Sequence, residues 1–264
     1  MIPGGAHTGA CYESTPDGRA GWRDYFLRKG FRVYIADWLG TGRSGIHPHF
    51  CTLKGNDVVD LFVKLLEKIK PVCPAILITH SMSGAYGWKI AEIVPHLISK
   101  IVALAPSAPG NIMEDSKEKF SDVVRKPIII NEEEAKKMWA NAYRFPHDSF
   151  ENYFNSLAAL SLSLANERVN YKNSQLKIDP RKLKSVKILI ITGEADPRHP
   201  QDVDRLIVDF FCRYGIKAKH YWLPDLGICG NGHLLMIEKN NLQIAELIYD
   251  WMTRSSLPSR NSWH

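Results

Sequence analysis

A serine in the stretch LITHSMSGAYG, residues 77–87, is the first candidate for chemistry. Ser81 follows an apolar run typical of a buried strand, and a helical pattern begins directly after it. A sharp strand-turn-helix corner would lift the hydroxyl above a sheet, and the positions two residues away on either side must then be small. Thr79 and Ser83 meet this requirement, in a variant of the Gly-x-Ser-x-Gly nucleophile motif. The alternative interpretation is a serine that only caps the helix.

The same corner has consequences for charge. It leaves the backbone N–H of Met82 at a helix N-terminus, where the N–H can stabilise an oxyanion. A serine hydroxyl is nearly inert at neutral pH, so a nucleophilic Ser81 needs an imidazole that takes its proton. His80, on the buried strand, should point away from the site. His47 and His49 have poor spacing for a metal, and no metal site is predicted.

The elements that must position these groups alternate along the chain. Strands are predicted at FRVYIADW (31–38), PAILIT (74–79), KIVALA (100–105), KILIIT (187–192) and KAKHYWL (217–223). Helices are predicted at 57–69, 84–94, 202–215 and 241–252. Strands that alternate with helices indicate an α/β fold, with a mostly parallel sheet and helices on both faces.

A segment without strand signals interrupts this alternation. Within residues 107–180, the ranges 131–145 and 150–167 have helical patterns and many aromatic residues. The segment is too long for a connection and too apolar for a disordered linker. We therefore expect residues 1–106 and 181–264 to form the core, and 107–180 to form an inserted helical cap over one edge of the sheet.

Two long blocks of the chain resemble a known family. The first reads GGAHTGACYESTPDGRAGWRDYFLRKGFRVYIADWLGTGRSG, from Gly4 to Gly45, and the second GICGNGHLLMIEKNNLQIAELIYDWM, from Gly227 to Met252. Both are similar to blocks of a bacterial and fungal esterase-like branch of the α/β-hydrolase superfamily. The resemblance covers nearly the whole chain except the cap. It implies an α/β-hydrolase fold and the chemistry of a serine esterase.

The resemblance also implies roles for individual residues. Ser81 would be the nucleophile and His233, in the loop before the last helix, the general base. The oxyanion hole would combine the Met82 N–H with an N–H from the early PGGAHTG loop, for which Gly5 is the candidate by its position in the motif. No cofactor is implied.

The acidic partner of His233 departs from that branch. The branch has a glutamate after the strand that follows the nucleophile helix, but Ala105 stands at that place here. Many other α/β-hydrolases have the acid after the next strand, where this chain reads TGEADPRHP. Asp196 is the predicted acid, Glu194 is the second choice, and a dyad without an acid is the third.

An apolar cap favours a bulky hydrophobic substrate. Candidate substrate contacts are His7, Trp38, Trp139 and Tyr143. The predicted activity is cleavage of a carboxylic ester or lactone of a hydrophobic small molecule through an acyl-enzyme. The alternatives are a non-hydrolytic enzyme of the same fold, for condensation, isomerisation or C–C cleavage in specialised metabolism, and a ligand-binding module without catalysis.

Composition limits the other function classes. The net charge of +6 comes from dispersed basic residues without a nucleic-acid motif, so no nucleic acid partner is expected. No apolar run reaches the roughly 18 residues that span a membrane. Five widely spaced cysteines and the absence of a signal peptide pattern favour free thiols and a cytoplasmic location. The chain begins inside the strand that leads to the oxyanion loop, so we expect the N-terminal strands of its relatives to be missing here. An uncovered sheet edge would favour a homodimer.

Overall fold

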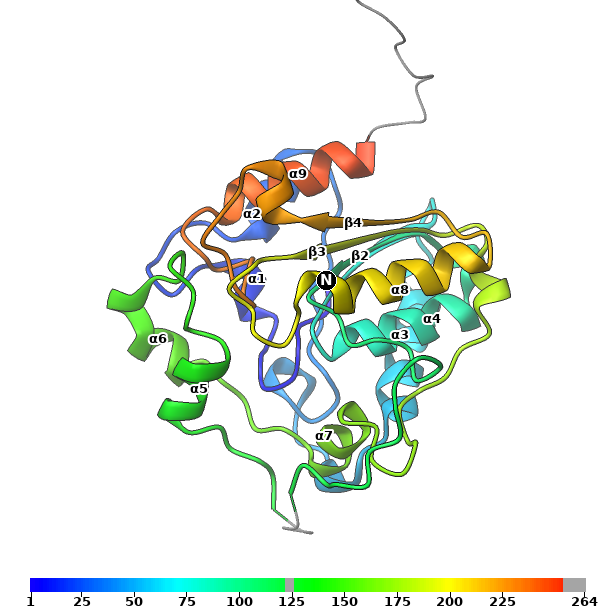
Figure 1. The fold of residues 1–264 in the computed structure, drawn as a ribbon, viewed down its shortest axis with the longest axis horizontal. Coiled ribbons are helices and arrows are strands. Elements are labelled where there is room, and N and C mark those ends of the chain that lie inside the picture. Colours follow the sequence, from blue (N-terminus) through cyan, green and yellow to red (C-terminus); the bar gives the residue numbers. More distant parts are fainter. Residues whose placement is uncertain (122–125, 254–264) are drawn as a thin grey trace, which may run out of the picture.

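A four-stranded sheet forms the centre of the molecule. The structure is a computed structural model in which residues 1–121 and 126–253 are described (Figure 1). The strands are all parallel and lie in chain order: β1 (Ala75–His80), β2 (Ile98–Leu104), β3 (Lys187–Thr192) and β4 (Ala218–Trp222). The carboxyl-terminal halves of β1, β2 and β3 are fully buried, as expected for parallel strands covered on both faces. The predicted α/β class is confirmed.

Helices cover both faces of this sheet. On one face α4 (Ser83–Ile93) packs on β1 and β2, and α8 (Gln201–Arg213) packs on β3 and β4. Beside α4 lies α3 (Gly55–Ile69). The opposite face holds α2 (Trp22–Arg28) and α9 (Asn241–Thr253), which contact each other (Figure 1). A short helix, α1 (Ala10–Glu13), precedes α2.

Helical periodicity explains why these segments dock. In α3 the side chains of Val58, Phe62 and Leu66 recur on one face and are buried. The carboxylate of Asp57 accepts from the Lys54 N–H at 2.8 Å and thereby satisfies a free donor at the start of this helix. Short 3-10 helices connect the main elements, at Gly42–Ser44, Phe50–Thr52, Pro95–Leu97, His147–Ser149, Pro180–Leu183 and Leu223–Leu226.

The predicted strand at residues 31–38 is wrong, because these residues form no ladder. The Met1 amine donates to the Tyr34 carbonyl at 2.7 Å, and the Ala36 N–H donates to the Met1 carbonyl at 3.4 Å. Ile2 in turn forms a parallel bridge with Thr79. Residues 1 and 2 thus separate 31–38 from β1, and this partner is too short to support a ladder. An apolar groove of about 810 Å³ continues between the two segments.

The described part of residues 107–180 contains three short α-helices: α5 (Glu132–Met138), α6 (Phe150–Asn155) and α7 (Leu162–Arg168). The helices predicted over 131–145 and 150–167 are therefore shorter than expected. Between α6 and α7 the backbone is extended, because the Leu160 N–H donates to Ile128 and the Ala158 N–H donates to Ala6. Figure 1 places α5 and α6 on the side toward which β4 points. The cap boundaries stay a prediction.

Two properties of the described part bear on the environment of the protein. None of the helices within residues 1–121 and 126–253 is long and apolar enough to cross a membrane. The five cysteines, all of which lie in the described ranges, are free thiols.

Candidate active site

Ser81 occupies a strained corner between β1 and α4. Its φ angle is +52°, a left-handed conformation that costs a non-glycine residue about 1–3 kcal/mol. The end of β2 holds the corner, because the Ser81 N–H donates to the Leu104 carbonyl at 2.9 Å and the Ser107 N–H donates to the Ser81 carbonyl at 2.9 Å. A Cβ on Gly84 would come within 2.5 Å of Pro106. The small residues that the sequence motif required thus leave room for this turn.

The loop of residues 3–7 lies directly against the serine corner. A Cβ on Gly4 would come within 2.6 Å of the His80 ring, and a Cβ on Gly5 within 2.4 Å of the Met82 sulfur. Ala6 has a φ of +60°, which turns the loop back. In the described chain the N–H groups of Gly5 and Met82 donate to no other backbone group. Both predicted oxyanion donors therefore lie beside Ser81 with unused hydrogens.

Asp196 and His233 form a buried pair. The loop after β3 supplies Asp196 and the loop before α9 supplies His233, whose Nδ1 hydrogen-bonds the Asp196 carboxylate. The imidazole is 1% and the aspartate 2% exposed, so water does not compete for this bond. Because a carboxylate only accepts, Nδ1 carries the hydrogen and Nε2 offers its lone pair. The structure brings the first-choice acid to the predicted base.

Burial and charge decide how this pair titrates. Burial lowers the pKa of His233 to about 3, although the adjacent Asp196 carboxylate acts in the opposite direction. Burial alone would raise the pKa of Asp196, but contact with His233 and the nearby charges of His199 and Arg198 outweigh burial and hold this pKa below its usual range. Around neutral pH the pair is therefore a carboxylate with a neutral imidazole, which is the state of a general base.

His233 Nε2 is buried and makes no hydrogen bond to any described residue. The hydroxyl of Ser81 lies at the same rim but is not bonded to it. The two are linked through His80, whose Nε2 bonds the His233 carbonyl at 2.9 Å and whose ring lies 4.6 Å from the His233 ring. The expectation that His80 points away from the site is wrong, because this side chain supports the His233 loop.

Glu194, the second-choice acid, has a different position. Its carboxylate accepts from the Gly230 N–H at 2.5 Å, and the Ala195 N–H donates to the Asn231 carbonyl at 2.9 Å. A Cβ on Gly193 would come within 2.3 Å of that same carbonyl. Glu194 thus helps to join the Asp196 loop to the His233 loop and does not reach the imidazole.

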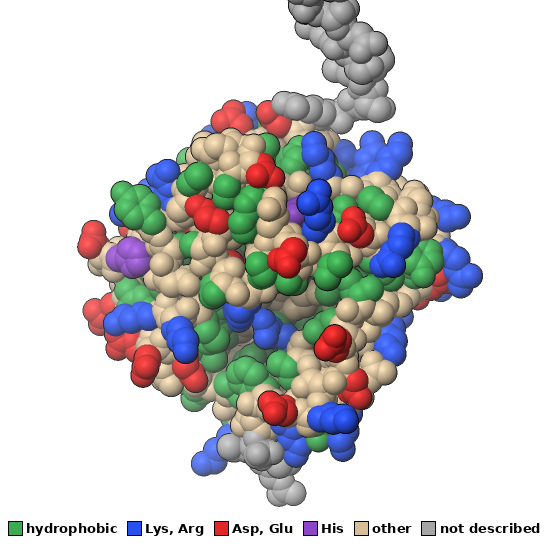
Figure 2. Space-filling view, in the orientation of Figure 1, with side chains coloured by type: hydrophobic (Ala, Val, Ile, Leu, Met, Phe, Trp, Pro, Cys, Tyr) green, Lys and Arg blue, Asp and Glu red, His purple; other side chains and the backbone are tan. Residues whose placement is uncertain are grey.

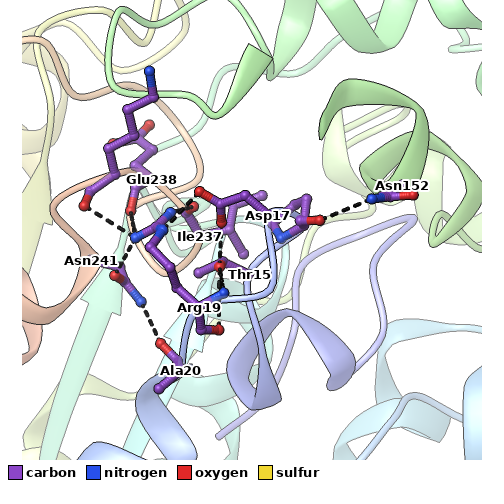
Figure 3. Close-up of polar contacts among 10 residues, drawn as sticks. Thr15, Asp17, Arg19, Ala20, Asn152, Ile237, Glu238 and Asn241 are labelled. Carbon is purple, nitrogen blue, oxygen red and sulfur yellow. Dashed lines mark hydrogen bonds and ion pairs between the residues drawn. The ribbon is translucent and has the colours of Figure 1, made fainter. Parts of the chain in front are cut away.

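A polar network centred on Arg19 connects the early part of the chain to residues 237–241 (Figure 3). The guanidinium of Arg19 donates to Asn241 Oδ1 at 2.9 Å, and to the carbonyls of Ile237, Glu238 and Lys239 at 3.1–3.2 Å. The buried carboxyl of Glu238 accepts from the Gly232 N–H at 2.7 Å and from Asn231 Nδ2 at 2.5 Å. We call Arg19, Asn231, Glu238 and Asn241 the rear network. It joins the two sequence blocks that carry the family resemblance.

His7 joins the 3–7 loop to the cap segment. Its Nδ1 bonds the Gly5 carbonyl at 2.9 Å and its Nε2 bonds the Tyr153 hydroxyl at 3.0 Å. Burial lowers the pKa of His7 to about 4, so the ring is neutral around neutral pH. The carbonyl requires a hydrogen on Nδ1, and the Tyr153 hydroxyl then donates to Nε2. Both nitrogens have protein partners, which leaves only ring carbons for a substrate.

The other predicted substrate contacts lie in three different environments. Trp38 is 3% exposed and its Nε1 donates to the Pro3 carbonyl and to Ser83 Oγ, each at 2.9 Å, so it supports the 3–7 loop. Trp139 packs against the His7 ring at 4.9 Å between centroids. Tyr143 is 81% exposed at the surface. Trp38 and Trp139 thus both contact the 3–7 loop, Trp38 at Pro3 and Trp139 at His7.

One group of side chains has ligand atoms close enough for a metal. Among the described residues, Asp196, His199 and His233 place theirs within 4.8 Å of one another, and all three are buried. The Nδ1 atoms of the two histidines are already engaged, since His199 bonds Asp204 at 3.0 Å and His233 bonds Asp196. The arrangement therefore fits a hydrogen-bonded base better than a metal centre.

Sequence reasoning missed Arg198, whose guanidinium is largely buried beside these residues. The signal was its position two residues after the predicted acid, in DPRHP. The Arg198 N–H donates to Asp196 Oδ1 at 3.1 Å, which fixes the turn. The Nε and Nη2 atoms of its side chain are buried and have no partner among the described residues.

Comparisons with known proteins agree with this fold. A sequence model described as "Alpha/beta hydrolase family" matches residues 1–247. The chain is 25% identical to the probable secreted lipase phiG of Fungal sp. (strain ATCC 74256), over 96% of this chain and 81% of that protein. A novel bacterial esterase has a similar structure, with a TM-score of 0.60 and 23% identity over 97% of this chain and 80% of that one. For the methylesterase MES16 from Arabidopsis the TM-score is 0.71, with 17% identity over 96% and 98% of the two chains. The chain therefore belongs to the alpha/beta hydrolase family.

Proposed function

We propose that the protein is a serine hydrolase that cleaves a carboxylic ester or lactone with Ser81, His233 and Asp196. The observation that carries the proposal is the His233 imidazole, which is bonded to a buried carboxylate through Nδ1 and has an unpartnered Nε2 at the rim where Ser81 lies. A buried nitrogen without a partner is costly in a purely structural histidine. As a general base, the same nitrogen needs to be unoccupied.

The chemistry follows from these positions. Ser81 Oγ attacks the ester carbonyl while Nε2 of His233 takes its proton, and Asp196 stabilises the imidazolium that forms. The N–H groups of Met82 and Gly5 would donate to the oxyanion of the tetrahedral intermediate. Collapse expels the alcohol, which receives the proton from His233, and water then hydrolyses the Ser81 ester by the same route. The hydrogen bond between the Ser81 hydroxyl and His233 Nε2 would form when bound substrate excludes water, since such bonds often tighten only in the substrate complex.

Apolar surfaces near the 3–7 loop support a hydrophobic substrate portion. A pocket of about 340 Å³ is lined by Ile46, Phe50, Pro127, Ala158 and Ala159 among others. It adjoins the oxyanion loop, because the Ala158 N–H donates to the Ala6 carbonyl at 2.9 Å. Residues 107–180 supply part of this lining, which fits their proposed role as a cap on a core of residues 1–106 and 181–264.

A fluorophosphonate probe tests the nucleophile. We expect the folded wild-type protein to be labelled, and Ser81→Ala to lose the label. Ser83→Ala is the matched control, because Ser83 donates to the Pro3 carbonyl and is 0% exposed. Labelling that persists in Ser81→Ala, or a folded wild type that stays unlabelled, contradicts the proposal. Release of p-nitrophenol and acid from a p-nitrophenyl ester then separates hydrolysis from the non-hydrolytic alternative.

Two expectations from the sequence stay predictions. A homodimer would bury the apolar groove beside β1, which Phe31, Val33, Leu66 and Ile76 line in part. Sedimentation equilibrium measures the dimer directly. The cytoplasmic location is equally open to test by fractionation of the producing cells.

A further inference from the structure

Arg198 and Arg168 bring two guanidinium groups to the candidate active site without an acidic partner of their own. No side chain within the described ranges forms an ion pair or hydrogen bond with the guanidinium of Arg198, and its Nε and Nη2 atoms are buried. Arg168 lies in the last turn of α7. Figure 2 shows basic side chains beside hydrophobic ones in the hollowed centre of this face.

Arg198 lies beside the acid of the candidate triad, since its N–H donates to Asp196 Oδ1 at 3.1 Å. Its positive charge acts on Asp196, whose pKa it lowers, and on His7 and His233, whose pKa values it also lowers. Burial lowers the pKa of Arg168 to about 10, and the charge of Arg198 adds to this effect. The arginines therefore lie close enough to repel each other. Arg168 comes from the last turn of α7, and Arg198 from the loop after β3 that also supplies Asp196.

The charges of this cluster do not balance. His7, His80 and His233 are neutral because burial lowers the pKa of each. The one carboxylate that acts on both arginines is Asp196, and it is already bonded to His233. The positive charge of Arg198 is thus left without a bonded acid among the described residues, with Nε and Nη2 buried. An unpaired buried cation is expensive, and the donors of a guanidinium match the two oxygens of a carboxylate.

We propose that Arg198, with Arg168 beside it, binds a carboxylate carried by the substrate. The preferred substrates are then esters that carry one negative charge. Their neutral part would lie against the apolar lining of the pocket of about 340 Å³. A single excess charge matches a carboxylate better than a phosphate dianion. This inference rests on the proposed esterase function of Ser81 and adds the substrate class.

A pair of matched substrates tests the proposal. The ratio of kcat/KM for p-nitrophenyl hemiglutarate to that for p-nitrophenyl valerate compares a carboxylate with a neutral ester of similar length. We expect a ratio well above one in the wild type and a 10- to 100-fold lower ratio in Arg198→Gln, the loss typical of a hydrogen-bonded charge. Arg198→Lys keeps the positive charge but loses the paired donors of the guanidinium, so its kcat/KM ratio should lie between those of the wild type and Arg198→Gln. Arg213→Gln, an exposed arginine at the end of α8, is the matched control and should keep the wild-type ratio. A wild-type ratio that Arg198→Gln leaves unaltered overturns the proposal.

A binding measurement keeps the test independent of turnover. In Ser81→Ala, calorimetry should detect monomethyl glutarate more strongly than dimethyl glutarate, and Arg198→Gln in that background should weaken the first at least tenfold. Equal binding of both compounds overturns the carboxylate site even if esters are hydrolysed. Tighter binding of phenyl phosphate than of benzoate overturns the choice of carboxylate. Failure of the esterase proposal itself would be seen separately, as a wild type that fluorophosphonate does not label.

Discussion

Two polar regions meet at His233, and they use their donors in opposite ways. In the rear network, the Arg19 guanidinium donates to Asn241 and to three backbone carbonyls, and its Nε is 2.8 Å from the Asp17 carboxylate. In front of the imidazole, Nε2 of His233 and two nitrogens of Arg198 have no partner among the described residues. We call Ser81, His233 Nε2 and Arg198 the front region. Each region contains an arginine, Arg19 in the rear network and Arg198 in the front region, so residue type alone does not distinguish the two regions.

This difference in hydrogen bonding indicates that the rear network stabilises the fold and that the front region serves the reaction. A satisfied buried network fixes one conformation, and its loss is seen in stability. Unsatisfied buried groups lower stability and persist where a ligand or a reacting atom completes them. The comparison therefore predicts that changes in the front region alter rates and specificity, whereas changes in the rear network alter the free energy of unfolding.

The largest expected effect concerns Asp196, the acid bonded to His233 in the candidate active site. Asp196→Asn should lower kcat about 10³- to 10⁴-fold for a neutral p-nitrophenyl ester, because the amide no longer selects the Nδ1–H tautomer. Glu194→Gln keeps an acceptor for the Gly230 N–H and is the matched control, expected to stay within about threefold of the wild type. If Glu194→Gln were the inactive variant and Asp196→Asn the active one, the assignment of the front region would be wrong.

A second prediction addresses the rear network. Arg19→Met should lower the free energy of unfolding by about 3 kcal/mol, because it removes charge-assisted bonds to three carbonyls and to Asn241. Urea denaturation measures this loss. Arg198→Met should cost less than about 1 kcal/mol or stabilise the fold, because it removes an unpaired buried charge. If Arg19→Met and Arg198→Met lowered the free energy of unfolding equally, the proposed difference between the two regions would be wrong.

The sequence predicted those parts of the fold that local patterns determine. Apolar runs located β1 and β3, helical periodicity located α3 and α9, and small residues around Ser81 indicated the corner. These features depend on residues adjacent in sequence. The strand expected at 31–38 depends instead on a partner that residues 1 and 2 supply only in part.

Tertiary contacts explain the remaining differences. The predicted cap helix 150–167 is interrupted because residues 158 and 160 bond to Ala6 and Ile128, which no helical pattern reveals. Trp38 and Tyr143 were grouped as substrate contacts, but one is 3% and the other 81% exposed. The role of Arg198 depends on the absence of a hydrogen-bond partner for Nε and Nη2 of its guanidinium among the described residues, and only coordinates contain that information.

A third prediction concerns Glu238 in the rear network. Burial raises the pKa of this carboxyl to about 7 in the folded protein, above the 4.5 expected when unfolded. The protonated form is therefore favoured by folding, and its contribution is complete below pH 4.5 and lost as the pH rises toward 7. The wild type should lose on the order of 2–3 kcal/mol relative to Glu238→Gln across this interval. Urea denaturation at several pH values measures this loss. If the free energy of unfolding depended on pH in the same way in both proteins, the raised pKa of Glu238 would be contradicted.

The smallest expected effect is a shift in the pH profile of the front region. Protonation of His233 removes the general base, and burial lowers the pKa of this imidazole to about 3. For a neutral ester, kcat/KM should therefore fall only well below pH 6.5, the ordinary value for histidine. The charge of Arg198 contributes to the lowered pKa, so Arg198→Gln should move this acid limb upward by less than about one pH unit. Arg213→Gln should leave the limb in place, since its side chain is exposed at the far end of α8. A limb that stays fixed in Arg198→Gln would mean that the guanidinium does not act on the imidazole, and the excess charge inferred for this site would then lie elsewhere.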